Sequence, residues 1–563
     1  MNRDDLIRTS EKTIEAHRRF YLNALESGKE IKISSLVETY KEMKPLLHDN
    51  LDQSSLGSSV FKYTLDRLPD CIYKAKTIFI TQSEKEVEKF KLIPGTWQKT
   101  RARSRRRVLF FNRATNTLIC FITSSSDIDD LVNTLIAYQI EWGKLKGLLK
   151  GEYQQFIETE DFSSLGISQD DWEKIKNSLG KDWQEKILSL SQKEEDISLF
   201  LFKPTWMGYR QIAQDWWNKA SQCLLLVDSE SIPIYFVSSN LHSLVNIVSG
   251  YVAQNQNDIF NYIEKSYPQL AKEWQRIKSE DNVLRVNDFL YYISKIYFRD
   301  FPEKLKDKID FETTLGINTF NIESKLSCGI QMIPVSAIAQ STLLDPHLKV
   351  IDPDELKRSK AFIININYPL GFSAYFLLSE ILENLRNIKG IYMIGKAAIL
   401  TGGVGDFQIP KVVFDENTGN FYFLKNVFNE DFPLGAFKNA VLKDQKSVSV
   451  YGTFLENQKH FENYTSAGFN IVEMESGPYL TAITEFQTKG QFPSRVNLHL
   501  DDLPFDLGII NYASDNPISK RTLGEGSLAL EGIEATYLAL LTTVQRIINL
   551  EEENSNQNKV NSP

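Results

Sequence analysis

The stretch GIYMIGKAAILTGGVGDFQIPKVV (residues 390–413) decides the fold expected for this chain. Two apolar runs flank a glycine-rich turn, which predicts a buried strand, a tight turn and a second strand. Similar buried-strand runs are AFIININYPLG (361–371) and LGIINYASDNP (507–517), and the helical pattern SAYFLLSEILENLRN (373–387) follows the first of them. This order predicts a βαβ unit in a parallel sheet, whose ligands bind beyond the carboxyl ends of the strands.

The rest of the chain supports a division into four segments. We expect a helical segment over residues 1–75, an α/β or α+β region of unknown role over 76–310, a C-terminal α/β domain over 325–550, and a disordered polar tail over 551–563. Strand-like runs upstream of residue 310 are KTIFIT (76–81), RVLFFN (107–112), TLICFITSS (117–125), CLLLVD (223–228) and PIYFVSSN (233–240).

Composition excludes several classes of protein. Hydrophobic residues make up 42% and charged residues 24% of the 563 positions, as in folded globular proteins. No apolar run reaches the roughly 18 residues needed to cross a bilayer, and the N-terminus lacks the apolar stretch of a secretory signal. The four cysteines and six histidines show no metal-ligand spacing. We therefore expect a cytoplasmic protein without a metal, a cofactor or a membrane partner.

The net charge of -9 argues against nucleic-acid binding by the chain as a whole. One local exception is KTRARSRRR (99–107), which holds six basic residues in nine positions. A solvated basic edge beside a strand is the preferred interpretation, and a contact with phosphate, nucleotide or RNA is the alternative.

Two strand-to-helix junctions in the N-terminal half carry polar clusters. SSNLHS (238–243) places hydroxyls, an amide and an imidazole where they could hold an anion, although ordinary helix capping is the preferred interpretation. Asp127, Asp129 and Asp130 open another expected helix, where acidic residues suit the helix dipole without any metal.

Three motifs in the C-terminal half come in an informative order. They are GKAAILTGGVGDFQIP (395–410), NIVEMESGPYL (470–480) and NYASDNP (511–517). Together they resemble the nucleoside phosphorylase and nucleosidase superfamily, in which a glycine-rich turn, an E-M-E motif and a strand ending in S-D follow one another. The sequence looks most similar to the AMP nucleosidase branch, on the basis of Lys396, of Gly452, Thr453 and Asn457 in a G-T-x-x-x-x-N segment, and of Asn516 and Pro517 after the Ser-Asp pair.

The resemblance implies a fold, a ligand and an assembly. The fold is a three-layer α/β/α nucleoside phosphorylase-like domain with a central mixed sheet, covering about 200 residues. The ligand is a purine nucleoside or nucleotide, and the chain is expected to form a homo-oligomer. Gly395, Lys396, Thr453 and Asn457 are expected to contact the substrate.

The chemistry of N-glycosidic bond cleavage explains the acidic residues. The leaving purine needs a proton or a strong hydrogen bond at N7, and Asp515 is the candidate general acid. By resemblance, Glu475 binds the ribose hydroxyls and stabilises the oxocarbenium-like state, while Met474 packs against the sugar. Ser514 positions Asp515 or the base, and Glu473 makes a structural or secondary contact. Taken alone, Ser-Asp-Asn-Pro is typical of a turn and Glu-Met-Glu of a solvated helix; their joint order favours a site.

Departures from the family pattern separate three hypotheses. Met393 stands where phosphorylases of the superfamily place a phosphate-binding arginine, and Lys396 replaces a Ser or Thr, which favours hydrolysis over phosphorolysis. Lys396 itself either contacts a phosphate or forms a salt bridge at the strand end. SCGIQMIPVSAIAQ (327–340) is the expected first strand of the family, but it contains no carboxylate to activate water. The leading hypothesis is a purine nucleosidase; the alternatives are a non-catalytic nucleotide-binding or interaction protein and a purine nucleoside phosphorylase.

Overall fold

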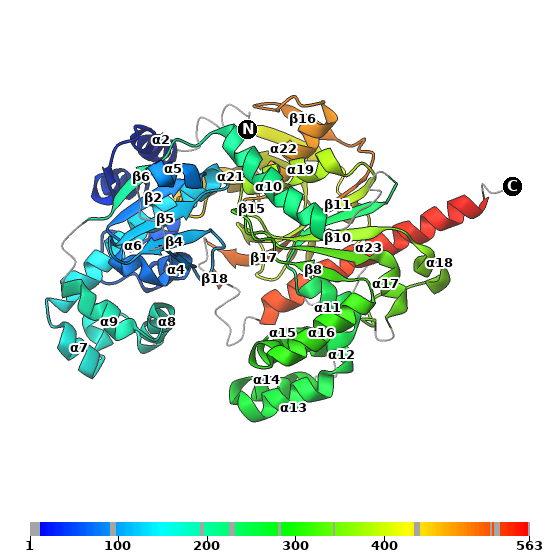
Figure 1. The fold of residues 1–563 in the computed structure, drawn as a ribbon, viewed down its shortest axis with the longest axis horizontal. Coiled ribbons are helices and arrows are strands. Elements are labelled where there is room, and N and C mark those ends of the chain that lie inside the picture. The colour runs from blue at the N-terminus through cyan, green and yellow to red at the C-terminus, as the bar shows by residue number, and fades with distance from the viewer. Residues whose placement is uncertain are drawn as a thin grey trace.

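The computed structural model describes most of the 563 residues. The described residues are 12–89, 97–191, 196–224, 231–279, 283–341, 344–432, 440–517, 521–522 and 530–560. They form two sheets with surrounding helices, which we call the small lobe (residues 12–201) and the large lobe (residues 206–560) (Figure 1). None of the described helices has the length and apolar content needed to span a membrane.

The small lobe is built on a six-stranded sheet with strand order β1-β6-β2-β5-β4-β3. Its strands are β1 (Ile31–Lys32), β2 (Thr77–Thr81), β3 (Trp97–Thr100), β4 (Leu109–Asn112), β5 (Thr117–Phe121) and β6 (Ser198–Leu201). Its helices are α2 (Lys12–Glu26), α3 (Val37–Met43), α4 (Ser58–Arg67), α5 (Glu84–Lys89), α6 (Ser125–Leu149), α7 (Tyr153–Thr159), α8 (Gln169–Leu179) and α9 (Trp183–Leu188). The strands β6, β2 and β5 are parallel, whereas β3, β4 and β5 form an antiparallel meander. Sheet and helices share one lobe, in agreement with the α/β or α+β pattern expected from the sequence.

The large lobe holds a mixed sheet with twelve strands among the described residues, in the path β16-β13-β12-β14-β15-β11-β7-β10-β9-β8, with β17 beside β11 and β12 and with β18 beside β17. Its strands are β7 (Ile234–Ser239), β8 (Asn318–Phe320), β9 (Ile330–Pro334), β10 (Phe362–Asn367), β11 (Ile388–Ile399), β12 (Phe407–Asp415), β13 (Asn420–Leu424), β14 (Val441–Ser449), β15 (Ile471–Glu473), β16 (Asn497–Leu500), β17 (Asp506–Asn516) and β18 (Arg521–Thr522). Its helices are α10 (Trp206–Leu224), α11 (Ser243–Ser249), α12 (Tyr251–Gln254), α13 (Gln256–Ser266), α14 (Pro268–Ser279), α15 (Val283–Asp300), α16 (Pro302–Thr314), α17 (Val335–Gln340), α18 (Pro353–Arg358), α19 (Ser373–Asn384), α20 (Val427–Glu430), α21 (Gln458–Ser466), α22 (Ser476–Gln487) and α23 (Leu530–Val560).

The large sheet is buried on both faces. Along β11, Ile391 and Met393 belong to one hydrophobic cluster, together with residues of α19 and α22. The alternate residues Tyr392 and Ile394 belong to a second cluster, together with residues of α11, α15 and α23. Since successive strand residues point to opposite faces, helices cover both sides of the sheet, and the architecture is the expected three-layer α/β/α with a mixed sheet.

The centre of this sheet differs from the expected βαβ unit in one respect. The strands β10 and β11 are parallel but not adjacent, because β7 lies between them and pairs with both in parallel. The sheet thus includes residues 234–239, which the expected segment division assigns to the N-terminal region. The expected first strand at 327–340 forms β9, which pairs antiparallel with β10 on the side away from β7. The pairing of strands so far apart in the sequence leaves no pattern in either segment from which it could be predicted.

Two further expectations need correction. Cys223 and Leu224 end helix α10 and are not part of a strand, and the rest of CLLLVD (225–228) lies outside the described residues. The expected tail after residue 550 continues α23 as helix to Val560. Polar contacts anchor this part of the helix: the carboxylate of Glu552 accepts hydrogen bonds from the backbone of Ile351 and Asp352 at 2.8 and 2.9 Å.

The two lobes share a core. One cluster of buried side chains contains Ile78 and Leu118 of the small sheet and also Ile391 and Ile509 of the large sheet. Because these apolar side chains form one continuous cluster, we treat the two lobes as packed together rather than as independent units.

Candidate functional site

The expected site residues gather where the parallel strands of the large sheet end. The strand β17 runs parallel to β11, and a bulge after Ala397 brings Ala398 opposite Asp515. Lys396 lies on β11 two residues earlier, and Glu475 immediately precedes α22. The charges of Asp515 and Glu475 both act on Lys396 and oppose the lowering of its pKa.

Two glycines show that this region contains open space. A Cβ atom added to Gly395 would meet no atom within 4 Å, and the same holds at Gly452, although Gly452 is buried. A buried position with no neighbouring atoms at this distance borders an internal space. The expected contact residue Gly395 is therefore placed beside room for a ligand.

Asp515 is oriented by its own neighbour. The Ser514 hydroxyl contacts the Asp515 carboxylate and also lies 3.1 Å from the carbonyl oxygen of Ala397. Ser514 therefore links the Asp515 side chain to β11. Both side chains are half-buried.

Glu473 stabilises the beginning of α22 through hydrogen bonds. Its buried carboxylate accepts hydrogen bonds from the backbone N–H groups of Glu475 and Ser476, each at 2.7 Å, and contacts the Ser449 hydroxyl. Burial raises the pKa of Glu473. With its oxygens engaged in the helix start, Glu473 makes the structural contact anticipated as one of its two roles.

Glu475 is the more available carboxylate of the pair. Its Oε1 accepts a hydrogen bond of 3.0 Å from the backbone N–H of Gly371, in the loop between β10 and α19. Burial, reinforced by the charge of Glu473, raises the pKa of Glu475 to about 7. A carboxyl group with this pKa changes its protonation state near neutral pH, which is typical of groups that bind or catalyse. Met474 lies half-buried on the other side of Gly371.

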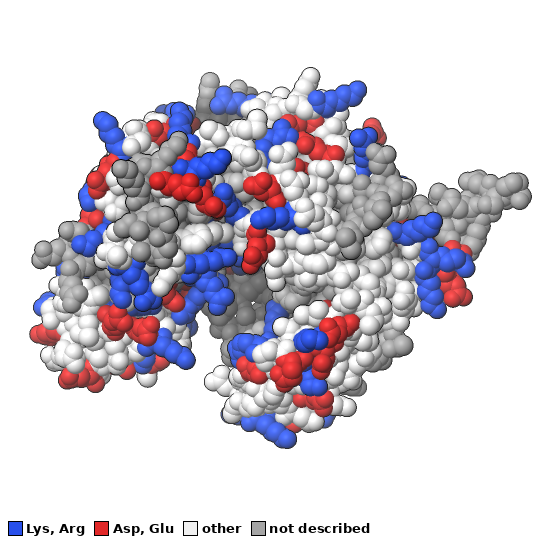
Figure 2. Space-filling view, viewed as in Figure 1, with Lys and Arg blue, Asp and Glu red and all other residues white. Residues whose placement is uncertain are grey.

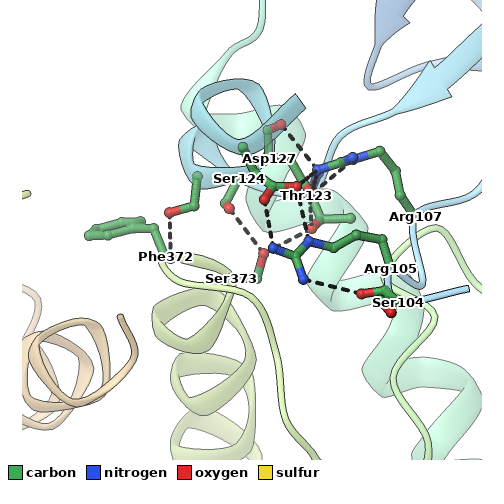
Figure 3. Close-up of polar contacts among 10 residues, drawn as sticks. Ser104, Arg105, Arg107, Thr123, Ser124, Asp127, Phe372 and Ser373 are labelled. Atoms are coloured by element: carbon green, nitrogen blue, oxygen red, sulfur yellow. Dashed lines mark hydrogen bonds and ion pairs between the residues drawn. The ribbon is translucent and has the colours of Figure 1, made fainter. Parts of the chain in front are cut away.

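The small lobe forms hydrogen bonds with the same loop between β10 and α19. The Ser126 hydroxyl accepts a hydrogen bond of 2.9 Å from the backbone N–H of Phe372. Figure 3 shows the neighbouring contacts, in which the Ser373 hydroxyl lies 2.8 Å from Thr123 Oγ1 and 3.0 Å from Ser124 Oγ. A hydrogen-bonded connection therefore runs from the start of α6 through the loop to Glu475.

Arginines of the basic segment 99–107 bind the start of α6, which contacts the large lobe. Arg107 binds Asp127 at 2.9 Å and Asp130 at 3.0 Å, and Arg105 binds Asp130 through two nitrogens (Figure 3). The side chain of Arg107 is 3% exposed, so the preferred interpretation as a solvated edge is wrong for this arginine. The aspartates in the first turn of α6 form ion pairs in addition to their favourable interaction with the helix dipole. Their carboxylates are buried, and breaking a buried ion pair by removing its cation is strongly destabilising.

Lys396 lies in a strongly charged environment. Its side chain reaches solvent, yet burial of much of its surroundings lowers the pKa of its ammonium group. The positive charge of Arg67 lowers this pKa further. Asp515 opposes this effect, and Arg105 adds to it. None of the salt bridges within the described residues involves Lys396, so the salt-bridge alternative for this lysine is not what the structure shows.

The segment 452–457 is held by the small lobe. Asn457 caps α21 by accepting from the His460 N–H at 2.9 Å, and it donates to the Met43 carbonyl at 3.1 Å. These bonds give Asn457 a structural task, whereas Thr453 remains half-buried beside it. Glu456 is a residue that motif reasoning missed: it is buried, and burial together with the charges of Glu416 and Asp515 raises its pKa well above the ordinary value.

The cluster 238–243 is a cap, as preferred from the sequence. The Asn240 side chain accepts from the backbone N–H groups of His242 and Ser243, at 3.1 and 2.8 Å. Ser238 accepts from the Tyr479 hydroxyl at 2.9 Å. Across the described ranges, no group of three or more His, Cys, Asp or Glu side chains is arranged to hold a metal ion.

Comparison with known families gives one decisive match. A family described as "Family of unknown function (DUF6909)" matches residues 33–549. The chain belongs to this family. No curated protein matches the DUF6909 chain.

Solved structures similar to this DUF6909 member include nucleosidases and a phosphorylase. The S-adenosylhomocysteine nucleosidase of Streptococcus pyogenes is 10% identical, with a TM-score of 0.31 over 56% of this chain and 98% of that chain. The 5′-methylthioadenosine/S-adenosylhomocysteine nucleosidase of S. pneumoniae is 10% identical, with a TM-score of 0.30 over 56% and 100%. A methylthioadenosine phosphorylase from an antarctic soil metagenomic library is 8% identical, with a TM-score of 0.27 over 35% and 73%. Likeness at this level carries no argument about activity, and the chemistry must be argued from the residues of this chain.

Proposed function

We propose that the chain is a purine N-glycosidase that hydrolyses a nucleoside or nucleotide to the free base and ribose or ribose 5-phosphate. One observation carries the proposal: β11 pairs with β17 so that Asp515 lies opposite Ala398, two residues beyond Lys396, and the charges of Asp515 and Glu475 both act on Lys396. A Cβ atom added to Gly395, next to Lys396, would meet no atom within 4 Å, which leaves room there for a ligand.

The mechanism assigns a role to each carboxyl group. The electron pair of the C1′–N bond moves to the base, which takes a proton or a hydrogen bond at N7 from Asp515. Glu475 binds the ribose hydroxyls and stabilises the positive charge that develops on the sugar. Water then adds its oxygen to C1′, and its proton passes to the Asp515 carboxylate that remains once the base has been protonated.

Glu456 favours its protonated form, because burial and the charges of Glu416 and Asp515 raise its pKa. Within the described part of the chain, no hydrogen bond or ion pair engages its side chain. Its backbone is nevertheless fixed, because its carbonyl oxygen accepts from the Leu46 N–H at 2.8 Å. A protonated carboxyl group on a fixed backbone can donate a hydrogen bond to the substrate or to water.

Base release is the direct test. The purified protein is incubated with AMP, adenosine, ATP and methylthioadenosine, with and without phosphate, and free base is measured by chromatography. We expect release without phosphate, and we expect Asp515→Asn to abolish it while the thermal unfolding temperature is retained. A strict requirement for phosphate would show phosphorolysis. Nucleotide binding without any release of base would show a binding protein on this fold and overturn the proposal.

A further inference from the structure

The large sheet ends on one side in a strand with a free edge. Strand β16 pairs in parallel with β13 and stands at the end of the strand order, so none of the described strands pairs with its other side (Figure 1). The Phe421 N–H donates to the Val496 carbonyl at 3.0 Å, so the backbone carbonyl of Val496 points to β13. Because these groups alternate in direction along a strand, those of Asn497 and His499 point away from β13, toward the free edge.

Exposed apolar side chains gather at the entrance to this strand. Phe486, Phe492 and Val496 belong to the segment that leads into β16, and all three are exposed. The ring of Trp206, 45% exposed, lies 5.3 Å from that of Phe492, and the adjacent Met207 is 71% exposed. Figure 2 shows uncharged surface along the same upper margin of the molecule, with side chains of both charges beside it. A concentration of exposed aromatic and apolar side chains marks a surface for protein contact.

The two ends of β16 carry opposite charges. Arg495 precedes the strand and Asp501 follows it, both exposed and each three residues from Leu498. If two copies of this strand pair antiparallel about Leu498, Arg495 of each copy lies opposite Asp501 of the other. The Arg495 backbone is left-handed, with a φ of 53°, so the strand begins after it and its long side chain makes this contact.

The same register joins the free backbone groups. It places Asn497 opposite His499, and both residues present an outward N–H and C=O, so the two copies can exchange both hydrogen bonds at each such pair. Centring the pair on Asn497 would instead place Arg495 opposite His499, and centring it on His499 would place Asn497 opposite Asp501. Of these three registers, only the one about Leu498 joins an arginine with an aspartate.

We propose that β16 docks on the β16 of a second copy of this chain, with the two strands antiparallel about Leu498. The contact is isologous and closes on itself, so it produces a dimer rather than a filament. A ladder of two short strands buries less than the roughly 1,200–2,000 Å² of a stable interface. The apolar side chains around Phe492 and Trp206 supply the remaining contact area.

Mass measurements over a range of concentrations test the dimer. Sedimentation equilibrium of the whole protein should show a dimer whose dissociation constant rises with salt, because salt screens the ion pairs. Arg495→Asp and Asp501→Arg each place like charges opposite one another at two positions, and each should raise the dissociation constant at least about 10-fold. A protein that stays monomeric at every concentration would overturn the proposal and leave the edge to a strand of another protein.

Mixing the two variants is the sharper test. In the mixed dimer, the introduced aspartate of one chain lies opposite the introduced arginine of the other, and the original Asp501 lies opposite the original Arg495. The equimolar mixture should therefore dimerise with a dissociation constant within about 3-fold of the original value. No dimer in a mixture of variants that circular dichroism shows to be folded would overturn the proposal.

Arg113→Asp is the matched control, because Arg113 is exposed in the turn between β4 and β5 and the charge changes by the same amount. It should alter the dissociation constant by less than about 2-fold. An equal effect of Arg113→Asp and Arg495→Asp would show that net charge, and not pairing at β16, controls the assembly, and would overturn the proposal. The measurement is of mass, so its result does not depend on whether the protein releases a base.

Discussion

Glu475 is fixed by a single backbone hydrogen bond in surroundings that disfavour its charge. Its pKa of about 7 lies above that of an unfolded glutamate, so the folded state retains a proton that the unfolded state loses. Stability from this group is therefore full below about pH 4.5 and is lost as the pH rises through about 7, by up to about 1.4 kcal/mol per pH unit.

A pH comparison separates stability from function at this residue. Glu475→Gln should flatten the fall in stability between about pH 4.5 and 7, measured by denaturant titration, and should remove the rise in base release through about pH 7 that ionisation of Glu475 produces. Glu380→Gln is the control, because burial also raises the pKa of Glu380 to about 7, beside Glu383 and Arg210 rather than at the site. It should alter the stability profile only. Loss of the activity limb in both variants would remove Glu475 from the mechanism.

Gly395 tests the open space itself. A Cβ atom there meets no atom within 4 Å, and a β-branched residue suits a strand, so Gly395→Val should leave the unfolding temperature within about 2 °C of the original value. The valine should nevertheless occupy the ligand space and reduce base release or nucleotide affinity at least 10-fold. Unchanged binding in this folded variant would place the ligand elsewhere.

At the scale of elements, the loop between β10 and α19 connects the small lobe to Glu475. Gly371 has a φ of +50°, and a Cβ atom there would stand 2.4 Å from Ser126 Oγ and 3.4 Å from Met474 Cε. The glycine is required both by its backbone conformation and by the close approach of two segments.

Gly371→Ala should therefore displace the loop and the hydrogen bond to Glu475. We expect a loss of stability of about 1–3 kcal/mol and a reduced kcat, because Glu475 is no longer held in place. The double variant Ser126→Gly with Gly371→Ala removes the clashing hydroxyl and should recover part of the activity, measured as kcat/KM. Identical kinetics for the single and double variants would show that the small lobe does not position Glu475.

At the scale of the whole molecule, aromatic packing joins the lobes. Phe454 of the large lobe is 3% exposed and lies 5.3 Å from the ring of Tyr63 and 6.3 Å from that of Tyr40, both in the small lobe. The cation–π contact of Arg18 with Tyr451, at 3.9 Å, adds a second connection.

Phe454→Ala should cost about 3–5 kcal/mol and uncouple the lobes. Differential scanning calorimetry should show one transition for the original protein and two for the variant, since the shared core is opened at the lobe boundary. Phe428→Ala is the control, because this buried ring packs wholly within the large lobe. It should lower the unfolding temperature without dividing the transition. A single transition in the Phe454 variant would mean that other contacts carry the coupling.

The sequence by itself determined the strands that carry Lys396 and Asp515 and the helix start at Glu475. Apolar runs, glycine turns and motif order are local patterns, and parallel strands bring their carboxyl ends to one edge. Only the tertiary structure decided that β7 separates β10 from β11 and that backbone N–H groups at the start of α22 engage the Glu473 carboxylate. Those relations depend on pairing and packing between segments far apart in the chain, and the energy of such contacts leaves no periodic mark in either segment alone.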